Sequence, residues 1–287
     1  MKDQKEISTI PEILCIGFFC HDLREGEYIL GGTASYASLM ANNLGKKTAV
    51  LTSVGSDFKY FDLFKKNNIS VLNKLAEHTT VFKNIYKGGI RHQYIFKRSE
   101  TLSLKDLPKK WTKAEIVKFC LIADEVDFSL LSAFPNALVA ATIQGWLRQW
   151  DAEGKISPKP MDWEKLMSID ILFMSDADIA GFEDYLPIII KNAAIVVITK
   201  GAFGATIYRG DEIFEFPSFP VNEVDPTGAG DVFATAFLIH YHSTKDIALS
   251  AAFAHAAASF VVEHVGATIP PLPMIQQRYE HYLKHYL

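Results

Sequence analysis

The sequence predicts an α/β fold: a mostly parallel central sheet with helices on both faces, plus a small β lid. Two observations support this prediction. Short apolar segments alternate with helical segments along most of the chain, as in βαβ units. At residues 81–96 two β-rich segments joined by glycines interrupt the alternation. No repeat, low-complexity segment or clear linker divides the chain, so we expect a single domain over residues 1–287.

The first part of the chain reads as strand–helix pairs. Residues 13–18 are an apolar run that leads into a glycine-containing stretch, which predicts a buried strand. Gly31 and Gly32 open a helix that extends to about residue 44, with Gly45 as its C-cap. The next predicted elements are a strand over 48–54 and a helix over 57–67.

The interruption consists of two β-rich runs, residues 81–86 and 90–96, around Lys87-Gly88-Gly89. Because a hairpin inserted into a parallel chain does not easily join the sheet, we expect it to project as a lid, with residues 23–30 beside it. The alternative is an antiparallel edge of the main sheet. A two-stranded flap is marginally stable alone, so its apolar face needs cover from substrate and the protein body or from a second subunit. We therefore predict a homodimer through the lids.

The rest of the chain continues the α/β pattern. Residues 99–113 are polar and predict a loop. Residues 138–143 fit a helix or a strand, and the following Gln144-Gly145 favours a strand. The other predicted strands are 116–122, 169–174 and 195–199, followed by a hairpin of 204–208 and 212–216 and by helices over 229–241, 246–264 and 272–286.

The composition describes a soluble globular protein, with 49% hydrophobic and 22% charged residues. A net charge of −4 without blocks of like charge argues against nucleic-acid binding. Three cysteines without CxxC spacing fit a reducing compartment better than a disulfide framework. We see no signal peptide, and the longest apolar run, residues 247–262, is too short to span a bilayer. We therefore expect a cytoplasmic protein with no membrane partner.

Residues 225–231, Asp-Pro-Thr-Gly-Ala-Gly-Asp, are the most informative segment, because a turn and two glycines open directly onto an apolar helix. Glycines let the backbone approach a ligand, and the free N–H groups of a helix start favour an anion. Asp231 would repel a bound phosphate unless it had another role, such as taking a proton from an attacking hydroxyl. The alternative is a glycine-rich turn in which Asp231 only starts the helix. The segment matches neither a Walker loop nor a Rossmann fingerprint.

These residues add up to a family resemblance: the chain resembles the ribokinase-like (PfkB) carbohydrate kinases. Gly31-Gly32-Thr33-Ala34-Ser35-Tyr36-Ala37 is similar to the N-terminal signature of that family, and residues 225–231 are similar to its C-terminal signature. The order of elements also fits from about residue 13 to the C-terminus. The resemblance implies ATP-dependent phosphorylation of a hydroxyl group on a small sugar, polyol or nucleoside acceptor, with Mg²⁺.

The resemblance also implies roles for individual residues. Asp231 is the implied catalytic base, and the N–H groups of Gly228, Ala229 and Gly230 form an anion hole. The implied acceptor-binding residues are Asp22, Gly31, Gly32 and Tyr36. The implied nucleotide-binding residues are Thr199, Lys200, Gly201, Gly204, Thr227, His255 and Ser259. Gly266-Ala267 matches a segment near a monovalent-cation loop in some members, which makes K⁺ a candidate cofactor beside ATP and Mg²⁺.

Two positions depart from the family pattern. Tyr36 stands where many sugar kinases carry an asparagine that contacts the substrate. Ser175 and Asp178 stand where the family often has Asn-x-x-Glu, which helps to place Mg²⁺. Because Asp is shorter than Glu, we expect a metal contact through water. The altered pair leaves a second function open, a catalytically weak or inactive sugar- or nucleotide-binding regulatory protein on the same fold, whereas the intact Asp231 and glycines favour a kinase.

Overall fold

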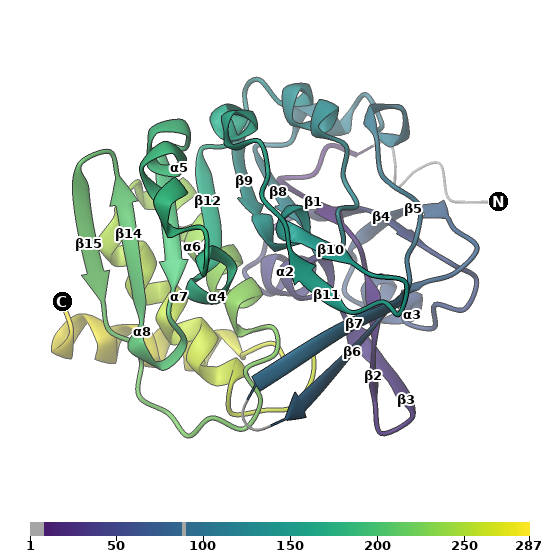
Figure 1. Cartoon of the computed structure of the whole chain (residues 1–287). Helices are drawn as coiled ribbons and strands as arrows, with labels where there is room; N and C mark the ends of the chain where they lie inside the picture. Colours follow the sequence, from purple (N-terminus) through teal and green to yellow (C-terminus); the bar gives the residue numbers. More distant parts are fainter. Residues whose placement is uncertain (1–8, 88–89) are drawn as a thin grey trace.

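The computed structural model describes residues 9–87 and 90–287 and places nine strands in one sheet (Figure 1). From edge to edge these are β15 (Glu212–Phe216), β14 (Ala205–Arg209), β13 (Ile195–Thr199), β12 (Ile171–Ser175), β9 (Leu138–Thr142), β8 (Ile116–Cys120), β1 (Ile13–Gly17), β4 (Thr48–Val54) and β5 (Ser70–Leu75). Neighbours from β13 to β5 pair in parallel. Only β14 and β15 pair antiparallel, at one edge. The predicted mostly parallel sheet is therefore confirmed.

Helices cover one face of this sheet. They are α2 (Thr33–Asn43), α3 (Phe61–Lys66), α6 (Ala229–Thr244) and α7 (Ile247–Val261), with α8 (Leu272–His285) packed on α7. The apolar side of α6 contacts the sheet directly, and the rings of Phe237 and Phe173 meet edge to face at 5.7 Å between centroids. No helix in the described part of the chain is long and apolar enough to cross a membrane.

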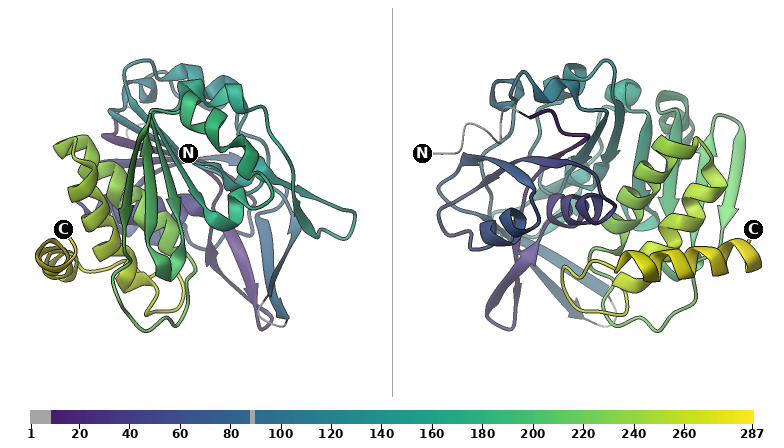
Figure 2. Two further views of the ribbon diagram at one scale, coloured as in Figure 1. Left: turned by 60° about the vertical axis from the view of Figure 1, so that its left-hand side comes forward. Right: turned by 180° about the vertical axis from the view of Figure 1, so that it is seen from behind.

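The opposite face is covered largely by single turns of helix. Besides α4 (Asp176–Ile179) and α5 (Leu186–Asn192), it carries 3₁₀ helices around three buried tryptophans, Trp111, Trp146 and Trp163. The 3₁₀ helices of the chain are η1 (Leu104–Asp106), η2 (Trp111–Lys113), η3 (Phe128–Ala133), η4 (Ile143–Leu147), η5 (Trp163–Ser168), η6 (Glu183–Tyr185) and η7 (Gly201–Phe203). Helices thus lie on both faces, as predicted, but the long ones are all on one side (Figure 2).

A second sheet projects from the main one and is called here the small sheet (Figures 1 and 2). Its strands are, in order, β3 (Glu27–Gly31), β2 (Cys20–Arg24), β6 (Thr80–Lys87) and β7 (Ile90–Lys97). The β6–β7 hairpin pairs through β6 with Cys20–Asp22 of β2, so it shares a sheet with residues 23–30 and does not form an edge of the main sheet. The Gly88-Gly89 turn lies outside the described residues.

Two local predictions differ from the structure. The helix expected over 57–67 begins only at Phe61, because the Asp57 carboxylate accepts hydrogen bonds from the N–H and hydroxyl of Thr79 and so ties residues 57–60 into a loop. A short antiparallel hairpin of β10 (Arg148–Trp150) and β11 (Ile156–Pro158) was not expected. Residues 138–143, which fitted either type of element, form the strand β9 as predicted.

Candidate active site

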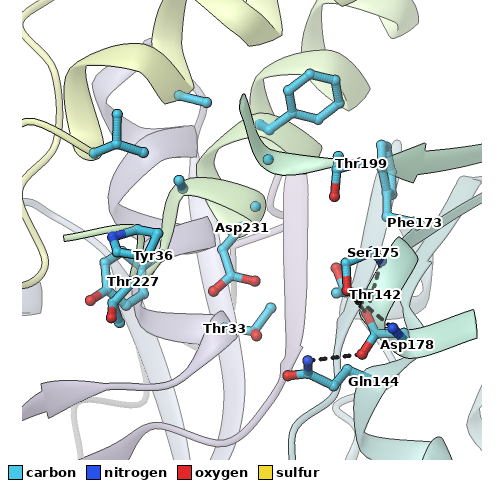
Figure 3. Close-up of a pocket in the computed structure, with 18 of the residues that line it drawn as sticks. Thr33, Tyr36, Thr142, Gln144, Phe173, Ser175, Asp178, Thr199, Thr227 and Asp231 are labelled. Carbon is cyan, nitrogen blue, oxygen red and sulfur yellow. Dashed lines mark hydrogen bonds between the residues drawn. The ribbon is translucent and has the colours of Figure 1, made fainter. Parts of the chain in front are cut away.

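A cavity of about 670 Å³ lies where the carboxyl ends of the parallel strands meet the small sheet and the start of α6 (Figure 3). Thr142, Ser175 and Thr199 end three neighbouring strands and line it. Ser175 and Thr199 are register partners in the sheet, so the strands end at one level. Ligands of open α/β sheets bind at this edge, which makes the cavity the candidate active site.

The glycine loop before α6 forms one wall of the cavity. Gly228 is left-handed, with a φ of 84°, and α6 begins at Ala229. The N–H groups of Gly228, Gly230 and Asp231 have no hydrogen-bond partner within the described chain, whereas that of Ala229 donates to the Pro226 carbonyl at 3.2 Å. We call residues 228–230 the anion nest, because free N–H groups at a helix start attract negative charge.

Asp231 lies in the first turn of α6 and faces the cavity beside the anion nest (Figure 3). Burial raises the pKa of its carboxyl. The positive charge of Lys118, a hydrogen bond with the Thr33 side chain and the positive charge of Arg148 lower the pKa and partly offset this rise. A carboxylate whose pKa is raised is a better proton acceptor than one in water.

The predicted acceptor-binding residues converge on one end of the cavity. Asp22, Gly32 and Tyr36 line it. Gly31 does not, but a Cβ on Gly31 would collide with the Asp22 carboxylate, so this glycine makes room for it. Burial raises the pKa of Asp22 to about 6. Tyr36 is 2% exposed, and its hydroxyl has no hydrogen-bond partner within the described chain.

Most of the predicted nucleotide-binding residues also line the cavity, and Thr227 lies beside Tyr36 (Figure 3). Those that line the cavity are Thr199, Gly201, Gly204, Thr227, His255 and Ser259. Lys200 does not line it; its Nζ lies 4.0 Å from Glu215. Burial lowers the pKa of His255 to about 3, so its ring is neutral at physiological pH, and its Nε2 is buried without a partner in the described chain. The Ser259 hydroxyl is already engaged, because it donates to Ala256 and accepts from Arg278.

Ser175 and Asp178 form a capping box at the start of α4, as Figure 3 shows. One Asp178 oxygen accepts from the Ser175 N–H at 2.8 Å and from its hydroxyl at 2.7 Å. The other accepts from Gln144 Nε2 at 2.9 Å. The described residues contain no group of three or more His, Cys, Asp or Glu side chains that could hold a metal alone. These residues fit Mg²⁺ that arrives with phosphates and keeps several waters.

The structure adds polar residues that the sequence analysis did not single out. Arg148 is 8% exposed, and its guanidinium donates to Gln93 Oε1 at 2.7 Å and to the Ile122 carbonyl at 2.9 Å. Gln93 also donates to Asn84, its register partner across the β6–β7 hairpin. Asn84, Gln93, Gln144 and Arg148 all line the acceptor end of the cavity.

Lys118 was missed as well. It is fully buried on β8, and its Nζ has no hydrogen-bond partner within the described chain. A lysine inside the apolar run of residues 116–120 is an unusual choice for a buried strand. That signal could have pointed to a buried charge near the acids of the site.

The chain matches known kinases in sequence. Residues 156–274 match the family model described as pfkB family carbohydrate kinase. Inositol 3-kinase of Arabidopsis thaliana is 26% identical over 285 residues, which cover 92% of this chain and 78% of that protein. A nucleoside kinase of Methanocaldococcus jannaschii is 29% identical over 270 residues, with 87% and 85% covered.

Solved structures share the fold. A pyrophosphate-dependent kinase in the ribokinase family, complexed with a pyrophosphate analog and myo-inositol, superposes with a TM-score of 0.80 at 22% identity, covering 92% of this chain and 99% of that one. The nucleoside kinase of M. jannaschii superposes with a TM-score of 0.75 at 20% identity, covering 94% and 98%. Residues 156–274 thus match the PfkB family of carbohydrate kinases, the chain as a whole has the ribokinase-like fold, and both signature segments lie at one cavity.

Proposed function

We propose that this protein is an ATP-dependent kinase that phosphorylates a hydroxyl group of a small sugar, polyol or nucleoside. The observation that carries the proposal is the position of Asp231. Its carboxylate faces the cavity beside the free N–H groups of the anion nest, with Asp22 and Tyr36 at the acceptor end and Thr199 and His255 at the donor end.

In the proposed reaction the acceptor hydroxyl lies between Asp22 and Asp231. Asp231 takes the proton while the hydroxyl oxygen forms a bond to the γ-phosphorus of ATP, and the bond from that phosphorus to the bridging oxygen breaks to release ADP. The N–H groups of the anion nest would stabilise the charge on the transferred group, and such donors are worth about 3 kcal/mol each in other enzymes. The Ala229 N–H would first have to leave the Pro226 carbonyl.

The acceptor end suits a ligand with several hydroxyl groups. It offers carboxylate, phenol, amide and guanidinium groups around one small volume, from Asp22, Tyr36, Asn84, Gln93 and Arg148. Each can donate to or accept from a hydroxyl. Relatives are named as kinases of inositol, nucleosides, cytidine and fructose, all polyhydroxylated molecules.

The donor end favours ATP over pyrophosphate, although one structural neighbour is a pyrophosphate-dependent kinase. Beyond the anion nest the cavity continues between apolar and aromatic groups, among them Phe219, Val221, Ala258 and Val262. Pyrophosphate has no group to fill that space, whereas a nucleobase does. Structural neighbours of this fold include a fructokinase with bound ATP and a ribokinase complexed with ribose and ATP.

Mg²⁺ would neutralise phosphate charge when it enters with ATP. Asp178 and Ser175 would contact its waters, because the Asp178 oxygens already accept three hydrogen bonds. K⁺ near Gly266-Ala267 is a further candidate cofactor. The regulatory alternative is not favoured by any contact in the described chain, since Asp231 and the anion nest both line the cavity.

A donor and acceptor screen tests the proposal. The purified protein is incubated with Mg²⁺ and either ATP or pyrophosphate, against panels of sugars, cyclitols and nucleosides, and the phosphorylated acceptor is measured. We expect ATP with at least one panel member to give turnover. Asp231→Asn should lower kcat by roughly 100-fold or more while ATP still binds. No turnover with any acceptor, or near-normal turnover in the variant, would refute the kinase proposal or the role of Asp231 respectively.

A further inference from the structure

Arg24 links the small sheet to the loop that leads into the anion nest. It is the last residue of β2, and its Nη1 lies 2.8 Å from Asp225 Oδ2. Its Nη2 donates to Thr227 Oγ1 at 3.1 Å, across 203 positions of sequence. One guanidinium therefore fixes two residues of the loop from an element at the acceptor end of the cavity.

Asp225 gives this link its strength. Asp225 is 7% exposed. Burial raises the pKa of its carboxyl, but the hydrogen bonds from Arg24 and Thr227 lower it below the usual range. Its second oxygen accepts from the Thr227 N–H at 3.0 Å, and its own N–H donates to the Val262 carbonyl at 3.0 Å. A buried carboxylate that loses its paired cation is strongly destabilised, so without Arg24 this turn would rearrange.

The same strand carries the acceptor-binding carboxylate. Asp22 and Arg24 are two residues apart on β2 and so point to one face of the small sheet. Asp22 lines the acceptor end of the cavity, while Arg24 holds the loop before Gly228. A shift of β2 on acceptor binding would therefore move both contacts together.

We propose that Arg24 is a positioning residue that holds the anion nest in its phosphate-binding geometry from the acceptor-side sheet. The proposal rests on the proposed function for the identity of the anion, a nucleotide phosphate. Arg24 acts through Asp225 and Thr227 and itself contacts neither the nest nor the reacting atoms.

Four variants test this role. Arg24→Gln removes the charge, and Arg24→Lys keeps a cation for Asp225 but gives up the forked contact to Thr227. Arg24→Gln with Asp225→Asn removes the uncompensated carboxylate. The control is Arg209→Gln, which breaks an ion pair of the same 2.8 Å length between Arg209 and Glu212 in the β14–β15 hairpin.

Two readouts apply to each variant: the Kd of Mg·AMP-PNP by calorimetry, and hydrogen exchange of residues 224–231 without ligand. Arg24→Gln should weaken Mg·AMP-PNP binding by roughly tenfold or more and speed exchange of the loop. Arg24→Lys should recover part of the affinity, and Arg209→Gln should match the wild type in both readouts. The double variant should fold better than Arg24→Gln without recovering affinity.

Wild-type affinity and exchange in Arg24→Gln would overturn the inference. So would a loss of affinity that Arg209→Gln shares, or that the double variant fully reverses. A wild-type protein that does not bind Mg·AMP-PNP would count against the proposed kinase function. In that case the exchange of residues 224–231 decides the role of Arg24 by itself, because it needs no ligand.

Discussion

Asp22→Asn should stabilise the folded protein at neutral pH while weakening acceptor binding. Burial raises the pKa of Asp22 from 3.8 to about 6, and the charges of Asp225 and Asp231 add to this effect, while Arg24 and Arg148 oppose it. At neutral pH the Asp22 carboxyl is therefore ionised, and its buried charge lowers the free energy of unfolding. The neutral amide has nearly the same shape and does not carry that cost.

The size of the effect follows from proton linkage. The folded state holds the Asp22 proton more tightly than the unfolded state, so the free energy of unfolding falls as pH rises from about 4 to about 6. At about 1.36 kcal/mol per pKa unit, the ionised group costs about 3 kcal/mol above that range. At pH 5 the same relation gives about 1.6 kcal/mol.

Urea denaturation of wild type and Asp22→Asn at pH 5, 6 and 7.5 measures this cost. The variant should be more stable by about 1.6 kcal/mol at pH 5 and by about 3 kcal/mol at pH 7.5. Asp211→Asn in the exposed β14–β15 turn is the control for the loss of a carboxylate. A variant that is less stable than wild type at pH 7.5, or a gap independent of pH, would refute the assignment of Asp22 as a buried charge kept for binding.

Three further predictions concern the anion nest, the metal and the assembly. Gly228→Ala should lower the melting temperature, because a Cβ there would collide with the Tyr36 ring. A Cβ at Gly230 would meet no atom within 4 Å, so Gly230→Ala should lower kcat with little effect on the melting temperature. Equal losses of melting temperature in the two variants would contradict this. Asp178→Ala should raise the Mg²⁺ concentration for half-maximal activity, and an unchanged titration would remove Asp178 from the metal site. Sedimentation at micromolar concentration should show a dimer through the small sheets, and a monomer would reject that interface.

The central strands could be predicted because their apolar runs are short and bounded by turn residues. β4 and β13 have the predicted bounds, since all or nearly all of their residues are buried in a parallel sheet. The glycine loop was equally visible, because its chemistry is contained in seven consecutive residues, 225–231. Strands and motifs that depend only on residues adjacent in sequence could therefore be predicted without a structure.

The further polar residues that line the acceptor end of the cavity could not be predicted from the sequence. Arg148 reaches Gln93 across 55 positions and follows a 3₁₀ helix that has no periodic pattern. The Arg24 contact to the loop before α6 spans 203 positions. Single polar residues give no signal until the fold brings them together. Asn84 and Gln93 are a partial exception, since paired polar residues in a hairpin mark one face.

The small sheet is held at its base, which changes what kind of lid motion we expect. The Ile95 N–H donates to the Gly154 carbonyl at 2.8 Å, and Tyr94 bridges to Lys155, so the turn between β10 and β11 secures the outer edge of β7. Gly154 has a φ of 80°, and a Cβ there would collide with the Ile95 carbonyl. Only glycine at position 154 therefore allows this backbone contact. On the other side, the ion pair between Arg24 of β2 and Asp225 ties β2 to the loop before α6.

Motion should therefore concentrate toward the free end of the β6–β7 hairpin and should not rotate the whole small sheet. Hydrogen exchange checks this directly. Residues 83–87 and 90–92 should exchange faster than 94–97, and all of them faster than 13–17 and 195–199, because the contacts that the described residues of β7 make with the β10–β11 hairpin, from Gln93, Tyr94 and Ile95, lie toward the base. Acceptor and Mg·AMP-PNP together should slow the hairpin end most. Protection at the hairpin end as high as in β1 without ligand would make the small sheet a fixed wall of the cavity, and phosphoryl transfer would then have to exclude water without closure of this sheet.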